Sequence, residues 1–208
     1  MAVRPIILWP ETWLNQQSAP VLPEEFNTEA LIELAADLVD TLSAARGVGL
    51  AAPQLGVHKR VVAVPDPKQG ILVLCNPTLS EFAPEKRVSL EGCLSLPTVT
   101  LPIERPIRVK VTARRVGGAV YEEVWSEFAA VAVQHECDHL DGKTIADNVG
   151  PLRKQMIRKK LTKVMREMKR AEENKNDVLK TVVRKVKELP TDPSDYVLPK
   201  SLPPGSGP

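Results

Sequence analysis

The stretch QHECDHLDG, residues 134–142, places two histidines four residues apart near the end of an apolar run. Residues four apart in an α-helix lie one turn apart on the same face, so His135 and His139 can present their imidazoles to one metal ion. Glu136 then lies beside the first histidine, in the position of a general base for metal-assisted hydrolysis. The spacing predicts a helical metal site and leaves open whether the ion serves chemistry or stability.

The apolar residues around this stretch predict a helix over residues 126–140. Three side chains precede His135 by seven, four and three positions and so share its face: Phe128, Val131 and Ala132. The glycine at 142 is placed to end the helix. Because the segment is apolar on most sides and strand-like sequence surrounds it, we expect a helix buried in the core of the protein.

The rest of the chain predicts an α+β fold around that helix. Residues 28–45 repeat apolar side chains every three or four positions after a capping Thr28, which predicts an N-terminal helix. Short apolar runs between residues 60 and 125, separated by proline and glycine, predict strands, and the glycine pair at 117 and 118 predicts a hairpin. We expect antiparallel or mixed β-sheets packed around a central buried helix that carries HExxH, followed by a long C-terminal helix.

The chain is expected to divide into a catalytic unit and two C-terminal parts. Residues 1–150 form the predicted metallohydrolase core, and residues 151–189 form a basic helix with an expected break near 171–177. Residues 190–208 contain six prolines and little apolar sequence, so we expect a disordered tail.

The composition is that of a globular chain, with 43% hydrophobic and 26% charged residues among 208. No apolar run approaches the roughly 18 residues that a membrane span requires. The three cysteines are too few and too unevenly spaced for a disulfide framework, which favours a reducing compartment. We therefore expect a cytoplasmic protein without a membrane partner.

The positive charge is concentrated in one segment. Residues 151–170 hold nine of the 28 lysines and arginines but only one of the 26 acids, so the rest of the chain carries a net charge of −6 although the whole has +2. Such a basic element is either a contact surface for an anionic partner or a solvated helix face.

A catalytic zinc or iron site needs three protein ligands and an open position, and HExxH supplies two of the three. The sequence offers Cys93 as the third, in EGCLSLP at residues 91–97, which we expect to be a loop ahead of the proline-rich LPIERP. A thiolate is a strong ligand for borderline metals, and the glycine before it permits a close backbone approach. The acids Glu172 and Glu173 are weaker candidates for the same role, and a buried reduced cysteine would equally explain Cys93 alone.

Another notable segment is GVGLAAPQ, residues 47–54, which follows the first predicted helix. Its small residues allow the backbone to approach a ligand, and Gln54 supplies one polar donor. A helix C-terminus that runs into a turn would explain the two glycines as well.

Together, GVGLAAPQ, EGCLSLP and QHECDHLDG resemble the three signature motifs of the peptide deformylase family, in the same order and spacing. The resemblance extends from about residue 6 to residue 170. The chain differs from the family pattern at residues 98–100 (TVT), where members often carry an arginine, and at Asn15, where they often carry a basic residue.

Carried over position by position, this resemblance implies a complete set of site residues. The implied metal ligands are Cys93, His135 and His139. The implied acid/base is Glu136, and the implied oxyanion donors are Gln54 and the backbone N–H of Leu94. The residues implied to surround a methionine-like side chain are Val48, Glu91, Phe128, Val131 and Ala132, with Gly49 against the substrate backbone.

The family resemblance also implies a reaction, a metal and partners. The reaction is removal of the formyl group from N-formylmethionine at the start of new polypeptides, with release of formate. One thiolate and two imidazoles suit both iron and zinc. The resemblance implies one Fe²⁺ per chain in the cell, with Zn²⁺, Ni²⁺ or Co²⁺ as substitutes. It further implies that the basic helix 151–170 contacts ribosomal RNA, and it gives no reason to expect DNA binding.

Two other functions compete with the deformylase interpretation. In the first, the chain is a metalloprotease in which an acid completes the HExxH site and Cys93 is incidental. In the second, it is a closed structural metal domain whose basic helix binds RNA or an acidic partner. Only the hydrolases need Glu136 for activity.

Overall fold

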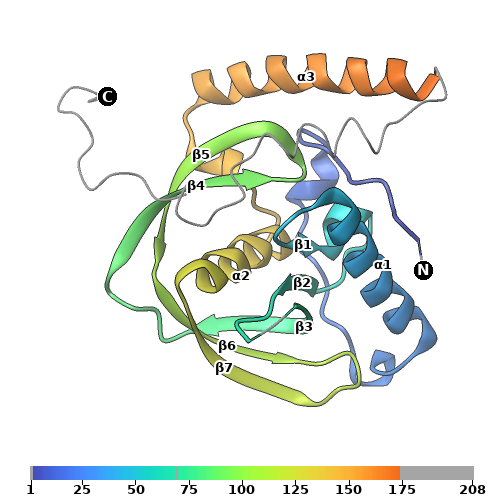
Figure 1. Ribbon diagram of the computed structural model, residues 1–208, viewed down its shortest axis with the longest axis vertical. Coiled ribbons are helices and arrows are strands. Elements are labelled where there is room, and N and C mark those ends of the chain that lie inside the picture. Colours follow the sequence, from blue (N-terminus) through green and yellow to red (C-terminus); the bar gives the residue numbers. More distant parts are fainter. Residues whose placement is uncertain (1, 69, 174–208) are drawn as a thin grey trace.

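The computed structural model describes residues 2–68 and 70–173, and Figure 1 shows them as two β-sheets with helix α2 between them. The helices are α1 (Glu29–Ala45), α2 (Glu127–Leu140) and α3 (Pro151–Glu173), with short 3₁₀ turns at Thr12–Asn15, Pro23–Glu25, Ala52–Leu55 and Ile145–Asn148. The strands are β1 (Leu50–Ala51), β2 (Val61–Pro65), β3 (Ile71–Ser80), β4 (Lys86–Cys93), β5 (Leu96–Pro106), β6 (Arg108–Arg114) and β7 (Val120–Ser126). The predicted α+β class with antiparallel sheets is confirmed.

The larger sheet has the strand order β1-β2-β3-β6-β7, and all its neighbours are antiparallel. The predicted hairpin joins β6 to β7 in continuous register from Arg108 opposite Ser126 to Arg114 opposite Val120. Burial alternates along β6, so that Val109 and Val111 face the core. One face of the sheet thus forms an apolar floor under α2.

The smaller sheet is the β4-β5 hairpin, and it corrects one prediction. Residues 91–97 were expected to be a loop, but residues 91–93 end β4, and β5 begins at Leu96 and continues through LPIERP. The prolines do not prevent this pairing because β5 has one neighbour in its sheet, so every second N–H points away from the ladder. Pro102 and Pro106 are an even number of residues apart and can both occupy such outward positions.

Helix α1 confirms its predicted bounds. The Thr28 Oγ1 atom accepts a hydrogen bond from the backbone N–H of Leu31, which satisfies a donor of the first turn. The helix ends at Ala45, and the capping residue Arg46 takes a left-handed conformation with a φ of 52°. Its buried face, including Leu38 and Leu42, packs in a cluster with Leu50 at the start of β1, which fixes the segment that leads to Gln54.

Helix α3 lies across the small sheet (Figure 1). It begins at Pro151, and its Ile157 and Leu161 join the same apolar cluster as Cys93. The predicted boundary at residue 150 stays a prediction, although this packing ties the helix to the preceding part of the chain. The expected break near 171–177 and the predicted tail at 190–208 lie wholly or largely outside the described residues. Among the described helices, none is long and apolar enough to cross a membrane.

Candidate active site

Helix α2 holds the HECDH stretch in its last two turns, between the two sheets (Figure 1). The helix begins where β7 ends and packs Val133, Cys137 and Leu140 on the large sheet. Its other side therefore faces the β4-β5 hairpin. His135 and His139 are both buried on α2, and they meet Cys93 at the end of β4.

The three predicted metal ligands lie together. The ligand atoms of Cys93, His135 and His139 are all within 4.8 Å of one another, and all three residues are buried. The Cys93 Sγ is 3.2 Å from the His139 Nε2 atom, and the two imidazole rings stand 5.1 Å apart at 71°. Burial lowers the pKa of His139 well below its ordinary value, so its ring is neutral, as a ligand must be. One soft and two borderline donors at this spacing fit a single divalent ion.

The acids considered as alternative ligands, Glu172 and Glu173, lie at the far end of α3, and their side chains are outside the described residues.

Gln54 is buried in the 3₁₀ turn after β1, and its hydrogen bonds fix the orientation of its amide. The Oε1 atom accepts a hydrogen bond from the backbone N–H of Ala51 at 2.8 Å. The Nε2 atom therefore points the other way, 3.0 Å from the Ser95 Oγ and 3.8 Å from the Cys93 Sγ. Leu94 directly follows Cys93 and is also buried. Both predicted oxyanion donors thus lie beside the predicted metal ligand.

Glu136 is 3% exposed, and its Oε2 atom is buried without a hydrogen-bond partner in the described part of the chain. Burial raises the pKa of this carboxyl to about 7. Gly49 packs against the same carboxyl group, since a Cβ atom at position 49 would come 2.8 Å from Glu136 Cδ. A glycine at 49 is therefore required by the position of Glu136, in addition to any contact with a substrate.

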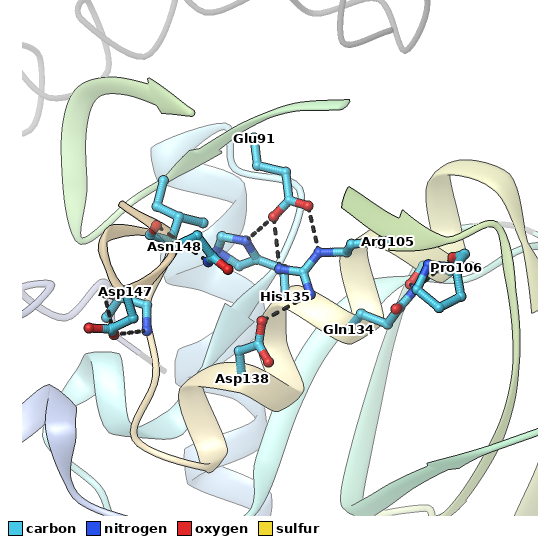
Figure 2. Close-up of polar contacts among 11 residues, drawn as sticks. Glu91, Arg105, Pro106, Gln134, His135, Asp138, Asp147 and Asn148 are labelled. Atoms are coloured by element: carbon cyan, nitrogen blue, oxygen red, sulfur yellow. Dashed lines mark hydrogen bonds and ion pairs between the residues drawn. The ribbon is translucent and has the colours of Figure 1, made fainter. Parts of the chain in front are cut away.

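Glu91 was expected beside the substrate side chain, but its carboxylate contacts two side chains of the protein. The Oε2 atom is 2.9 Å from the His135 Nδ1, and the Arg105 guanidinium donates to both carboxylate oxygens (Figure 2). Burial raises the pKa of Glu91, but the hydrogen bonds from His135 and Arg105 outweigh it and hold the pKa below its ordinary value. The carboxylate is therefore charged, and it orients the His135 ring.

The remaining predicted substrate residues occupy more open positions. Phe128 and Val131 are half-buried on the face of α2 that carries His135, and Ala132 is buried. Val48 is 39% exposed and lies beside Gly49. The α2 residues form an apolar strip that leads from the surface to the buried histidine.

Comparison with known proteins identifies the family. The family model for polypeptide deformylase matches residues 3–155, which is most of the chain. This chain belongs to the polypeptide deformylase family. The peptide deformylase of Acinetobacter baumannii is 36% identical over 172 residues, covering 82% of this chain and 96% of that protein. The peptide deformylase of Thermotoga petrophila is 40% identical over 157 residues, covering 76% and 93% of the two chains.

Solved deformylase structures share the fold. A crystal structure of a peptide deformylase from Legionella pneumophila superposes with a TM-score of 0.75 at 35% identity, covering 81% of this chain and 99% of that one. The Acinetobacter baumannii peptide deformylase bound to Met-Ala-Ser gives a TM-score of 0.67 at 36% identity, covering 71% and 99%.

Two residues of this deformylase site were not found from the sequence. Ser95 contacts the Gln54 amide, and its place inside EGCLSLP was the available signal. Arg105 is 7% exposed and contacts Glu91. Arg105 alternates with the apolar residues Leu101 and Ile103, which was a signal for a buried charge pair. Its partner became identifiable only when β4 and β5 were seen to pair.

Proposed function

We propose that this chain is a peptide deformylase that removes the formyl group from the N-formylmethionine of nascent polypeptides and releases formate. The observation that carries the proposal is the buried cluster of Cys93, His135 and His139 beside Glu136, whose Oε2 atom has no hydrogen-bond partner among the described residues. Family membership supports it. The relative crystallised with Met-Ala-Ser supports it further, because that tripeptide is what would remain of a formylated Met-Ala-Ser after the reaction.

The three ligands would hold one divalent ion, with Fe²⁺ in the cell and Zn²⁺, Ni²⁺ or Co²⁺ as substitutes. When bound, such an ion supplies a Lewis acid for the formyl oxygen and lowers the pKa of an attacking water molecule towards 7. His135 and His139 would bind it as neutral imidazoles. Burial lowers the pKa of His135, but hydrogen bonds with Cys93 and Glu91 outweigh it and raise the pKa well above its ordinary value, so metal binding would displace a proton from this ring. Glu91 would accept a hydrogen bond from the His135 Nδ1–H, which keeps the remaining proton on Nδ1 and leaves the Nε2 lone pair free for the ion.

Glu136 moves the proton. Its Oε2 atom takes a proton from the attacking water and delivers it to the nitrogen of methionine as the C–N bond breaks. A carboxyl whose pKa lies at about 7 can do both near neutral pH, because neither protonation state is strongly favoured. As negative charge develops on the former formyl oxygen, the Gln54 Nε2 and the Leu94 N–H donate hydrogen bonds to it, each contributing roughly 3 kcal/mol to transition-state stabilisation.

Phe128, Val131, Ala132 and Val48 would form the apolar surroundings of the methionine side chain, and Gly49 would contact the peptide backbone. The cytoplasm is the proposed place of action, because formylated chains are made there. The exposed bases of α3 are proposed to contact the ribosome, which brings the enzyme to its substrate.

The test is release of formate from formyl-Met-Ala-Ser by protein loaded with Fe²⁺ or Ni²⁺. Wild-type protein should release formate and leave internal peptide bonds intact. Glu136→Ala should bind the metal and fold but release almost none, whereas Cys93→Ala should lose the metal itself. Cleavage of internal bonds by a Cys93→Ala protein with full metal content would instead support the metalloprotease alternative.

A further inference from the structure

A closed circuit of polar and charged side chains links α2, which carries His135 and His139, to both strands of the small sheet (Figure 2). His135 on α2 contacts Glu91 on β4, Glu91 contacts Arg105 on β5, and Arg105 returns to Asp138 on α2 through an ion pair of 2.9 Å. His135 and Asp138 are three residues apart on the same helix. The circuit therefore ties one turn of α2 to both strands of the small sheet.

The contacts within the circuit leave Glu91 no freedom to rotate. Its Oε1 atom accepts the Arg105 Nε–H at 2.5 Å, and its Oε2 atom accepts from a second guanidinium nitrogen at 3.0 Å while contacting the His135 ring. A guanidinium holds a carboxylate in this two-pronged geometry, whereas a lysine ammonium acts as a single point charge. The fork fixes the plane of the carboxylate and therefore the direction from which His135 is held.

Stability of the fold alone does not explain the circuit, because burying its charges has a large free-energy cost. The side chains of Arg105 and Glu91 are 8% and 5% exposed, and removing two charges from water costs several kcal/mol for each ion. Apolar residues of similar volume would pack a two-stranded sheet against a helix at least as well. The geometry therefore suggests a role in holding the imidazole.

We propose that Arg105 is a positioning residue for the metal site, which fixes Glu91 and, through Glu91, the ring of His135, and that Asp138 holds the guanidinium from the other side. This inference rests on the proposed function only in that His135 is taken to bind the metal. It predicts an effect on metal affinity in folded protein, apart from any effect on substrate turnover.

The two ends of the circuit differ in their access to solvent. A cavity of about 360 Å³ that opens to solvent lies behind α2, and Arg105 and Asp138 both line it. Asp138 is 34% exposed, whereas Glu91 lies in the interior. Water can replace part of the contact made by Asp138. Water that enters the space left by Arg105 can donate a hydrogen bond to Glu91, but it supplies neither the positive charge nor the paired donors of the guanidinium. Loss of Arg105 should therefore weaken the metal site more than loss of Asp138.

A second arginine that lines the same cavity provides a matched control. Arg60 lines it and pairs with Asp141, one residue past the end of α2, at 2.7 Å. Within residues 2–68 and 70–173, the guanidinium donates to Asp141 and to the backbone carbonyls of Leu140 and Pro77, and not to Glu91 or a metal ligand. An Arg60→Ala variant removes a guanidinium from the same cavity wall and should leave the metal affinity unchanged.

The experiment measures the dissociation constants of Zn²⁺ and Co²⁺ by competition with a chelator, together with urea unfolding of each metal-free variant. Losing the direct partner of a metal-bound histidine usually weakens metal affinity about 10- to 100-fold. Arg105→Ala leaves that partner, Glu91, in place but unfixed, so it should raise both constants by up to about that factor. It should also change the visible Co²⁺ spectrum. Asp138→Asn should raise the constants by a smaller factor, and Arg105→Lys should recover only part of the loss.

A second part of the experiment tests whether a small guanidinium compound can replace the missing side chain of Arg105→Ala. Methylguanidinium can reach the space left by Arg105→Ala through the cavity and should restore metal affinity, whereas methylammonium at the same concentration should restore little. If folded Arg105→Ala binds both metals as wild type does and is merely less stable without metal, its role is structural and the proposal is overturned. If Arg105→Ala does not fold, Asp138→Asn decides: a several-fold weaker affinity supports the proposal, and an unchanged affinity overturns it.

The test of Arg105 and the test of the deformylase function can fail independently of each other. Wild-type protein that binds one metal ion per chain but releases no formate would overturn the deformylase function, and the Arg105 result would still decide the positioning role. Conversely, if the wild-type enzyme is active and Arg105→Ala leaves its metal affinity unchanged, only this inference is overturned.

Discussion

The burial of Glu136 that suits its carboxyl to proton transfer also lowers the stability of the folded protein. Its carboxyl is buried, its Oε2 atom has no recorded partner in the described residues, and burial raises its pKa from 4.5 to about 7. Above pH 4.5 the unfolded chain loses this proton while the folded chain keeps it, so the folded state becomes less stable as the pH rises towards 7. Above pH 7 the full penalty applies.

Replacing Glu136 by glutamine should therefore stabilise the metal-free protein at pH 8, by at most about 3 kcal/mol. The gain should shrink as the pH falls and vanish below about pH 4.5, where the carboxyl is protonated in both states. Urea unfolding at pH 5 and pH 8 measures it, with Glu33→Gln on the exposed face of α1 as the control. A gain for Glu136→Gln that did not depend on pH would contradict this explanation.

The packing of Gly49 against Glu136 makes a second prediction at the same scale. Gly49→Ala adds a Cβ atom 2.8 Å from the Glu136 Cδ, so the carboxyl must move. A displacement of about 1 Å can cost roughly 100-fold in turnover, and we expect formate release to fall by a factor of that order while the metal content stays at one per chain.

Gly117→Ala is the matched control for Gly49→Ala, because a Cβ atom at position 117 meets no other atom within 4 Å. That variant should keep full activity. Equal losses of activity in the two variants would show that glycine replacement acts through general destabilisation rather than through Glu136.

At the level of elements, periodicity predicted the helices well and the β4-β5 hairpin poorly. Helix α1 was predicted with its cap, and the His135 and His139 spacing predicted their shared helix face, because both signals are local. The strands within residues 91–106 were missed because proline usually interrupts a strand, and the sequence contains Pro102 and Pro106. Both prolines are compatible with β5 because this strand has one neighbour in its sheet, which the sequence does not reveal. Arg105 was missed for the same reason, since its contact with Glu91 depends on pairing between two strands.

The packing of α3 bears on the predicted boundary at residue 150. Leu161 is fully buried in the cluster that contains Cys93, whereas Met156 on the outer face is 64% exposed. Leu161→Ala should lower the free energy of unfolding by about 2–5 kcal/mol, and Met156→Ala should change it by less than about 0.5 kcal/mol. Urea unfolding measures both. Equal, small effects would mean that the helix is a separate unit, as the predicted boundary implies.

At the scale of the whole molecule, the charge of the chain is divided between a basic helix and an acidic remainder. Helix α3 turns its apolar residues, among them Ile157 and Leu161, towards the small sheet, so most of its lysines and arginines remain exposed. Lys163 and Arg166 are three residues apart on the exposed side of the helix. This arrangement suits a contact with the phosphates of ribosomal RNA.

The proposed ribosome contact should weaken steeply with salt, because each neutralised phosphate releases about 0.7–0.9 of a counterion. The double variant Lys163→Gln/Arg166→Gln should bind ribosomes more weakly than wild type and show a logarithmic salt slope lower by about 1.4–1.8. Its turnover of formyl-Met-Ala-Ser should be unchanged, because neither side chain contributes to the cluster of Cys93 and the two histidines. Lys86→Gln/Arg108→Gln removes two exposed bases from β4 and β6 and should leave both ribosome binding and its salt slope as in wild type. Co-sedimentation between 50 and 200 mM KCl, about the range in which phosphate contacts are strongly screened, distinguishes the two variants, and equal binding by both would leave α3 as a solvated helix face.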